Sequence, residues 1–136
     1  MLIEDDDAIR KILIEAKTIA VVGASEKPWR DSNSIMRFLI DVGYKVFPVN
    51  PHYSEVLEIP CASDLSRVPR GIDIVDVFRR PEALGSIVDE AITNGAKTLW
   101  LQLGVVNDNA AKKAEQAGMN VIMDHCIRVD HRRLVR

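Results

Sequence analysis

The chain has 136 residues and is 47% hydrophobic and 28% charged, a balance typical of a folded globular protein. Its length predicts one domain over residues 1–136. The formal net charge of −2 gives no electrostatic basis for nucleic-acid binding. No apolar run approaches the ~20 residues that a membrane span needs, and the acidic start is unlike a signal peptide. We therefore expect a cytoplasmic protein.

The N-terminal part of the chain combines one helical pattern, one strand pattern and a second helical pattern. Residues 5–16 place apolar side chains at helical spacing, behind Asp5 as a helix N-cap. The apolar run 18–25 predicts a buried strand that ends in a tight turn of small residues. A helical stripe of apolar residues then leads to Gly43, which ends the second helix.

The remainder of the chain continues this alternation. Four further apolar runs predict strands, at residues 45–49, 72–78, 98–103 and 120–123. Helical patterns precede the last two strands, one opened by Pro81 and the other capped by Asn107 or Asp108. The connection before the third strand is expected to hold a little strand near 58–61 and one helical turn near 64–66. A basic tail through Arg136 follows the last strand.

Alternating helices and near-continuous apolar strands predict a parallel sheet covered on both faces. Three helices end in a glycine that precedes a strand by two or three residues, as expected of left-handed C-caps: Gly43, Gly95 and Gly118. We therefore predict an α/β fold with a doubly wound, five-stranded, parallel Rossmann-like sheet and an extra N-terminal helix. The expected strand order is 3-2-1-4-5.

In such a fold, ligands bind beyond the carboxyl ends of the strands, near the switch point beside the first strand. There Gly23 and Ser25 offer backbone N–H groups and a hydroxyl to a phosphate, although a plain tight turn is an alternative. The NAD fingerprint is incomplete. In the fingerprint G-x-G-x-x-G, Ser25 occupies the position of the second glycine and Pro28 that of the third. The second strand ends in Asn50-Pro51, where an NAD-binding fold has an acidic residue.

Basic residues follow two of the predicted strands. Lys27 and Arg30 lie in the loop after the first strand, and Arg79 and Arg80 end the third. Two basic clusters at neighbouring strand ends suit a ligand with phosphates at two separate places. Trp29 and Phe78 are suited to stack on a base, or Phe78 belongs to the core.

Catalytic and metal-binding patterns are absent from the sequence. The histidines are scattered, no H-E-x-x-H or Ser/His/Asp order occurs, and Cys61 and Cys126 lack metal-ligand spacing. Cys126 is expected to be a buried structural thiol, with a reactive thiol as the alternative. Trp100 is expected in the core, and Asp76 is expected to hydrogen-bond neighbouring backbone or a hydroxyl. We predict no catalytic residue and no metal.

The sequence resembles the family of small stand-alone CoA-binding proteins, which is related to the CoA-binding domain of the succinyl-CoA synthetase α-subunit. The likeness runs in order over residues 5–135. His125 departs from it, because the family has Arg there. The segments that carry the likeness are 22–25, Pro28, Arg30, 43–46, 48–51, 77–79, 95–97, 100–102 and 124–126.

The resemblance implies that coenzyme A binds at the strand ends. By this likeness the residues that would hold the pyrophosphate are Gly23, Ala24, Ser25, Lys27, Pro28, Arg30, Ser32 and Ser34. Those near the ribose phosphate would be Asn50, Pro51 and Tyr53. Phe78 and Arg79 would lie near the adenine, and Gln102 and Gly104 would border the pantetheine path.

The predicted function is non-catalytic binding of CoA or acyl-CoA, because the synthetases phosphorylate a histidine in a second domain that has no counterpart here. One alternative is a small NAD(P)-binding enzyme or regulatory subunit. A component of a CoA-thioester enzyme is another. A further hypothesis is a mixed disulfide between CoA and Cys126 or Cys61. The sequence does not identify a protein partner.

Overall fold

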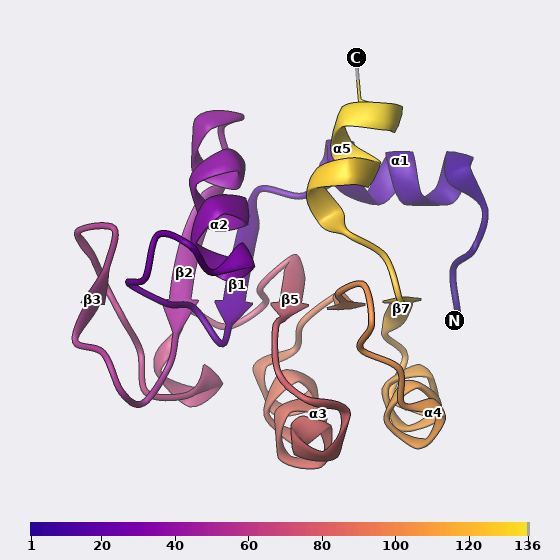
Figure 1. Cartoon of the computed structure of the whole chain (residues 1–136). Helices are drawn as coiled ribbons and strands as arrows, with labels where there is room; N and C mark the ends of the chain where they lie inside the picture. Colours follow the sequence, from indigo (N-terminus) through magenta and orange to yellow (C-terminus); the bar gives the residue numbers. More distant parts are fainter. Residues whose placement is uncertain (136) are drawn as a thin grey trace.

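The computed structural model describes residues 1–135 and contains a five-stranded parallel sheet with helices on both faces (Figure 1). The strands are β1 (Thr18–Val22), β2 (Lys45–Val49), β5 (Ile74–Val77), β6 (Thr98–Leu101) and β7 (Asn120–Met123). A small antiparallel hairpin of β3 (Glu55–Val56) and β4 (Ile59–Pro60) lies in the connection between β2 and β5. The predicted fold class is confirmed.

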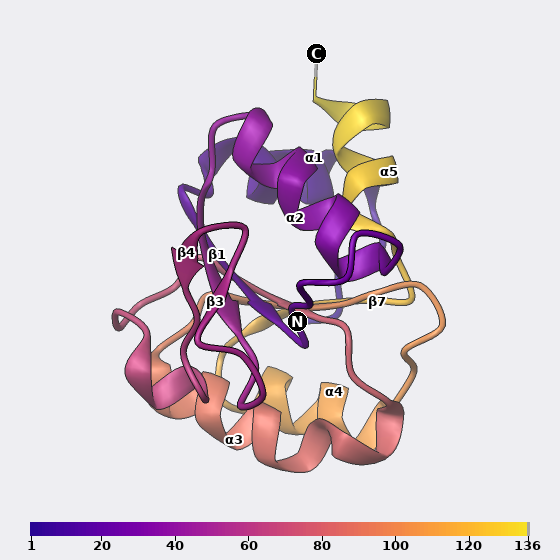
Figure 2. The ribbon, with the colours of Figure 1, turned by 60° about the vertical axis from the view of Figure 1, so that its left-hand side comes forward.

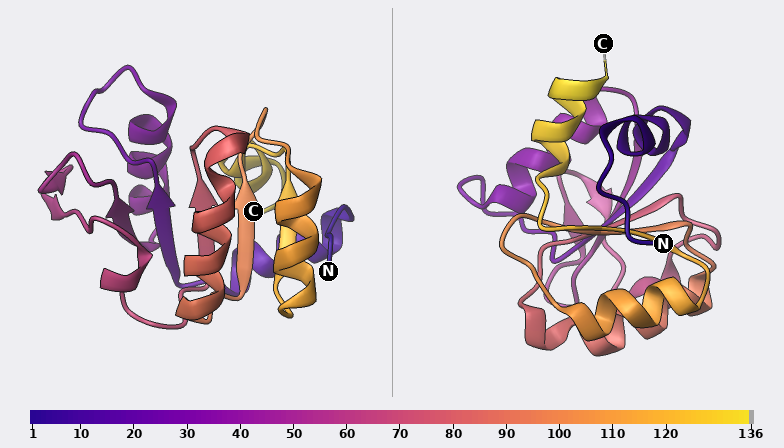
Figure 3. Two further views of the ribbon diagram at one scale, coloured as in Figure 1. Left: turned by 90° about the horizontal axis from the view of Figure 1, so that it is seen from below. Right: turned by 90° about the vertical axis from the view of Figure 1, so that its right-hand side faces the viewer.

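The helices divide between the two faces of the sheet (Figures 1 and 2). One face carries α1 (Asp6–Glu15), α2 (Asp31–Asp41) and α5 (Ile127–Leu134). The other carries α3 (Leu84–Asn94), α4 (Asp108–Gln116) and the 3-10 turn η1 (Leu65–Arg67), while a second 3-10 turn, η2 (Pro81–Ala83), leads directly into α3. In Figure 3, the left view shows α3 and α4 side by side, and the right view shows them on the side of the sheet opposite α1 and α5. Each apolar helix face therefore meets one side of the sheet.

The strand order differs from the expected one at a single point. The observed order is β2-β1-β5-β6-β7, so β5, the third predicted strand, pairs with β1 instead of β2. Pro48 explains why β2 lies at the edge: its carbonyl accepts from the N–H of Ala62 on the outer side, where proline's missing N–H is not needed by a partner strand. The switch point consequently lies between β1 and β5.

The predicted helix ends are confirmed where capping residues specify them. Asp5 accepts hydrogen bonds from the N–H groups of Asp7 and Ala8 at the start of α1, and Asn107 caps α4 through the N–H of Ala110. Gly95 ends α3 with a left-handed φ of 78°. These local signals fix where the helices begin and end.

The buried centre of the sheet confirms that Trp100 belongs to the core and corrects the hydrogen bond expected for Asp76. Trp100 is fully buried, and its indole N–H donates to the carbonyl of His125. Asp76 lies in register between Val21 and Trp100, fully buried, and no residue within 1–135 hydrogen-bonds its carboxyl oxygens. Its side chain enters an apolar layer, whereas the nearby backbone groups are used in the sheet, so the expected hydrogen bond does not form. Burial raises the pKa of Asp76 well above its usual value.

The C-terminal segment, predicted as a basic tail, is the helix α5. Arg133 makes a two-point ion pair with Asp6 of α1, at 2.7 and 2.9 Å, and also contacts Asp130. These contacts between distant parts of the chain supply the helix with partners that its short apolar pattern did not reveal. Arg136, the end of the predicted tail, lies outside the described residues. No helix within residues 1–135 is long and apolar enough to cross a membrane.

Candidate ligand-binding site at the strand ends

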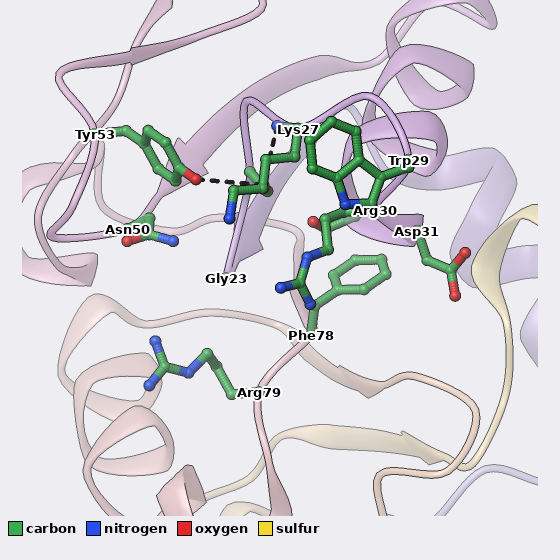
Figure 4. A pocket seen from close by; sticks show the side chains of 11 residues that line it. Gly23, Lys27, Trp29, Arg30, Asp31, Asn50, Tyr53, Phe78 and Arg79 are labelled. Carbon is green, nitrogen blue, oxygen red and sulfur yellow. Dashed lines mark hydrogen bonds between the residues drawn. The ribbon is translucent and has the colours of Figure 1, made fainter.

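A pocket of about 620 Å³ lies at the carboxyl ends of β1, β2 and β5 (Figure 4). It therefore occupies the switch point between β1 and β5, where parallel α/β folds bind ligands. Its lining comes from the turn and loop after β1, the start of α2 and the ends of β2 and β5: Gly23, Ser25, Lys27, Trp29, Arg30, Asp31, Ser32, Asn50, Tyr53, Phe78 and Arg79.

Gly23 is required by the close approach of β1 and β5. Its φ is 90°, in the left-handed region, and a Cβ on this residue would lie 2.8 Å from the carbonyl oxygen of Phe78. Its N–H donates to the carbonyl of Val49 in β2 at 2.9 Å. The turn is thus fixed to both neighbouring strands, and only glycine fits at its start.

Several backbone N–H groups at this turn are available to a ligand. Among residues 1–135, no hydrogen bond uses the N–H of Ser25, which lines the pocket, or that of Ala24, which is fully buried beneath the turn. The same holds for Asp31 and Ser32 at the start of α2, where Arg30 is the N-cap and supplies no capping side-chain bond. The positive end of an eleven-residue helix and an uncapped first turn favour an anion.

The turn is held in place by buried amides and hydroxyls. The side-chain amide of Asn50 donates to the carbonyl of Ala24 at 2.8 Å, and that of Asn33 donates to the carbonyl of Ser25 at 2.7 Å. The Ser25 hydroxyl accepts from the N–H of Lys27 at 3.1 Å and lies 3.5 Å from the Tyr53 hydroxyl (Figure 4). These intramolecular bonds orient the donors of the turn.

Cations dominate the walls of this first pocket. Lys27, Arg30 and Arg79 line it, and none of them forms an ion pair with a residue in the range 1–135. Asp31 is the acidic residue of the lining. Trp29 is 76% exposed and lies in Figure 4 near Arg30 and Phe78. The pocket therefore offers positive charge, oriented N–H groups and aromatic surface together.

A second pocket of about 460 Å³ adjoins the first and extends towards β6 and α5. The two share Asp31, Phe78 and Arg79. Gln102 is buried in the second lining, where its oxygen accepts from the N–H of Ile127 at 3.1 Å. The remaining members of this lining are Ile35, Arg80, Pro81, Leu103, Gly104, Val105, Cys126 and Arg128.

The structure brings most of the predicted site residues together. Nine of the fifteen line the first pocket, and Gln102 and Gly104 line the second. Outside both linings lie Ala24, which is buried beneath the turn, and Pro28, Ser34 and Pro51. Ser34 accepts a hydrogen bond from Arg128 at 3.3 Å. The sequence analysis did not select Asp31 and Arg128, and it selected Arg80 only as part of a basic pair.

The two cysteines and the histidines occupy different surroundings. Cys126 lines the second pocket, whereas Cys61 lines neither pocket and its thiol faces the carbonyl of Asn50. Burial raises the pKa of Cys61. His125 contacts Asp130 at 2.6 Å and lines neither pocket. Within residues 1–135 there is no cluster of side chains able to hold a metal ion.

Comparison with known proteins identifies the family. Residues 17–132 match the family described as CoA binding domain. The chain belongs to this family. The resemblance found in the sequence is therefore confirmed, and the pockets described above lie within the matched residues.

The chain matches some relatives over nearly their whole length and others over a small part of it. The chain is 42% identical over 123 residues to the protein YneT of Bacillus subtilis (strain 168), covering 90% of this chain and 91% of that protein. A hypothetical protein from Pyrococcus horikoshii OT3 has the same fold, with a TM-score of 0.95 and 42% identity over 98% of this chain and 94% of the other. Acetate–CoA ligase (ADP-forming) I of Archaeoglobus fulgidus is 25% identical over 125 residues, and the match covers 85% of this chain but 18% of the ligase.

Proposed function

We propose that the chain binds coenzyme A, free or acylated, in the two adjoining pockets and catalyses no reaction on it. The observation that carries the proposal is the combination, at one turn, of unbonded backbone N–H groups with three cations that have no ion-pair partner among residues 1–135. Such a cradle suits a pyrophosphate. Membership of the CoA binding domain family supports coenzyme A as the nucleotide.

The pyrophosphate is assigned to the turn after β1. The N–H groups of Ser25 and Ser32 would donate to its oxygens, Lys27 and Arg30 would neutralise its charge, and Gly23 and the buried Ala24 would shape the turn. Pro28 and Ser34 lie outside the lining, so we assign them a supporting role in the loop and in the first turns of α2.

The other parts of the ligand are assigned to the neighbouring strand ends. Asn50 and Tyr53 would lie near the ribose phosphate, with Pro51 beside them in the chain. Phe78 and Arg79 would contact the adenine, since an aromatic ring and a guanidinium both stack on a base. The pantetheine arm would then run into the second pocket, past Gln102 and Gly104.

The proposed absence of catalysis rests on the side chains of the lining. No histidine from residues 1–135 takes part in either lining, and Asp31 is the acidic residue of both. We therefore propose that no histidine acts as a general base on the thioester. Incubation of the protein with acetyl-CoA should release no more thiol than buffer alone, and protein-dependent thiol release would contradict this part of the proposal.

Calorimetric titration tests the ligand. CoA should bind, NAD and NADP should bind far more weakly, and dephospho-CoA should bind about tenfold more weakly than CoA, because one charge-assisted contact is lost. We expect the Arg79 guanidinium, placed near the adenine, to contact the 3′-phosphate of the adjoining ribose as well, so Arg79→Gln should reduce the difference between CoA and dephospho-CoA. Arg37→Gln is the matched control, since Arg37 is exposed on α2 and lies outside both linings. Tighter binding of NAD(P) than of CoA would favour the alternative of a small NAD(P)-dependent enzyme.

A further inference from the structure

The second pocket has room and chemistry beyond what a free thiol needs. Its volume is about 460 Å³, and it continues from the first pocket across Asp31, Phe78 and Arg79. If the pyrophosphate lies on the turn after β1, the sulfur end of coenzyme A enters this pocket. An acyl group on that sulfur would therefore lie against its walls. The inference developed here rests on the proposed function.

The walls of the second pocket carry an excess of positive charge. Arg79 and Arg80 reach it from the end of β5, and Arg128 reaches it from the first turn of α5. None of the three is in an ion pair with another residue in the range 1–135, and Asp31 is the acidic member of the lining. Asp124 lies close by in the chain, but its carboxylate accepts from the N–H of Gly104 at 2.7 Å and does not line the pocket.

Arg128 is held in position within this wall. One of its terminal nitrogens donates to the Ser34 hydroxyl at 3.3 Å, and this bond links α5 to α2. The hydroxyl of Ser34 in turn donates to the carbonyl of Asp31. A guanidinium has five donors, so this single bond leaves most of them free for an anion.

Gln102 adds a neutral donor that is more deeply placed. It is 6% exposed, and its oxygen is already taken by the N–H of Ile127 at 3.1 Å. No hydrogen bond among residues 1–135 uses its amide nitrogen. Because the amide oxygen of Gln102 already accepts from the backbone of α5, its NH₂ group is the part of the side chain that can bond to a ligand. A thioester or amide carbonyl in the pocket can accept from this group.

From these features we propose that the second pocket receives the acyl end of an acyl-CoA and favours acyl groups that end in a free carboxylate. The carbonyl beside the sulfur accepts from Gln102, the short carbon chain lies along Ile35 and Val105, and the terminal carboxylate pairs with Arg128. Arg80 adds positive charge at the rim. A neutral acyl group of the same length makes the first two contacts and lacks the third.

Calorimetric titration with two thioesters of equal chain length tests this specificity. Glutaryl-CoA should bind about tenfold more tightly than pentanoyl-CoA, since a charge-assisted contact separates them. In Arg128→Gln the ratio of the two affinities should fall to about one, while in Arg37→Gln it should equal that of the unsubstituted protein. Circular dichroism and the unfolding midpoint of Arg128→Gln establish that the variant is folded.

The outcomes separate this inference from the function on which it rests. Equal affinities for the two thioesters in the unsubstituted protein overturn the inference, whereas CoA binding at the same site still supports the proposed function. Failure of CoA and both thioesters to bind overturns both. If Arg128→Gln instead abolishes the difference between CoA and dephospho-CoA and keeps the glutaryl preference, Arg128 contacts the ribose phosphate, and its assignment to the acyl group is wrong.

Discussion

At the scale of single residues, Gly23 decides whether the site can form. The first turn after β1 approaches β5 so closely that a side chain at this position would meet the backbone of Phe78. Asn50 and Asn33 then hold the carbonyls of the next two residues. One glycine and two side-chain amides from different parts of the chain therefore hold the N–H groups of the turn in their orientation.

Gly23→Ala is expected to lower both stability and ligand affinity. The left-handed φ alone costs about 1–3 kcal/mol for a residue with a side chain, and the contact with the Phe78 carbonyl, at 2.8 Å, adds to it. Gly71→Ala is the matched control, because Gly71 has a φ of 76° and open space around its Cβ position. Urea unfolding and CoA titration should show the larger loss for Gly23→Ala, and a CoA affinity changed in that variant alone. Identical effects of the two substitutions would refute the steric argument.

At the scale of elements, the N-terminus of α4 is tied to the strand-end loops. Asn107 accepts from the N–H of Ala110 at 3.0 Å and donates to the carbonyl of Pro81 at 2.9 Å. One side chain thus caps α4 and holds η2, and Pro81 lines the second pocket. On the opposite face, Arg133 joins α5 to α1. Polar contacts as well as apolar packing therefore fix η2 and α5, which both contribute to the lining of the second pocket.

Asn107→Ala should destabilise the protein by about 1–2 kcal/mol, since it removes an N-cap together with a bond between elements. Asn107→Asp keeps the capping oxygen and loses the donor to Pro81, so its effect should be intermediate. Lys112→Ala, on the exposed side of α4, serves as the control and should change stability little. Chemical denaturation measures all three. An Asp variant as unstable as the Ala variant would show that capping is not the main contribution.

At the scale of the whole molecule, Asp76 links the stability of the fold to pH. It is a fully buried carboxyl in the middle of the sheet, with no hydrogen-bond partner among residues 1–135, and burial raises its pKa well above the usual value. The folded protein therefore keeps its proton at pH values where the unfolded chain, with a pKa near 3.9, has lost it. The contribution of Asp76 to the free energy of unfolding is fully present below about pH 4 and is lost as the pH rises through the pKa of the folded state.

Asp76→Asn should flatten the dependence of stability on pH and make the protein more stable than the unsubstituted chain at neutral pH.

Asp73 provides the opposite case in the same strand region. Burial acts to raise its pKa, but hydrogen bonds from the N–H groups of Lys17 and Thr18 and the ammonium of Lys97 lower it overall. Asp73→Asn should therefore reduce stability above about pH 4, where its carboxylate is ionised. Unfolding free energies from pH 3 to pH 9 test both signs, and a steeper fall with pH in Asp76→Asn would contradict the assignment.

Much of the fold and the site was predictable because it depends on local sequence. Strands and helices follow from the period of apolar residues, and Asp5, Gly95 and Asn107 mark helix ends through bonds to residues a few positions away. The turn at Gly23 and the strand-end positions of Arg79 and Gln102 follow from the same patterns. That the chain forms a single domain stays a prediction.

The sequence by itself determined the α/β class, the small-residue turn after β1 and the family, because these reside in short segments whose meaning does not depend on their neighbours in space. Only the tertiary structure decided that β5 pairs with β1, that Asp76 has no partner, and that α5 brings Arg128 to Ser34. Each of these depends on which edges and faces meet across many residues of chain. Packing between segments that are distant in the chain determines which of these arrangements has the lowest free energy, and a local sequence pattern does not specify that packing.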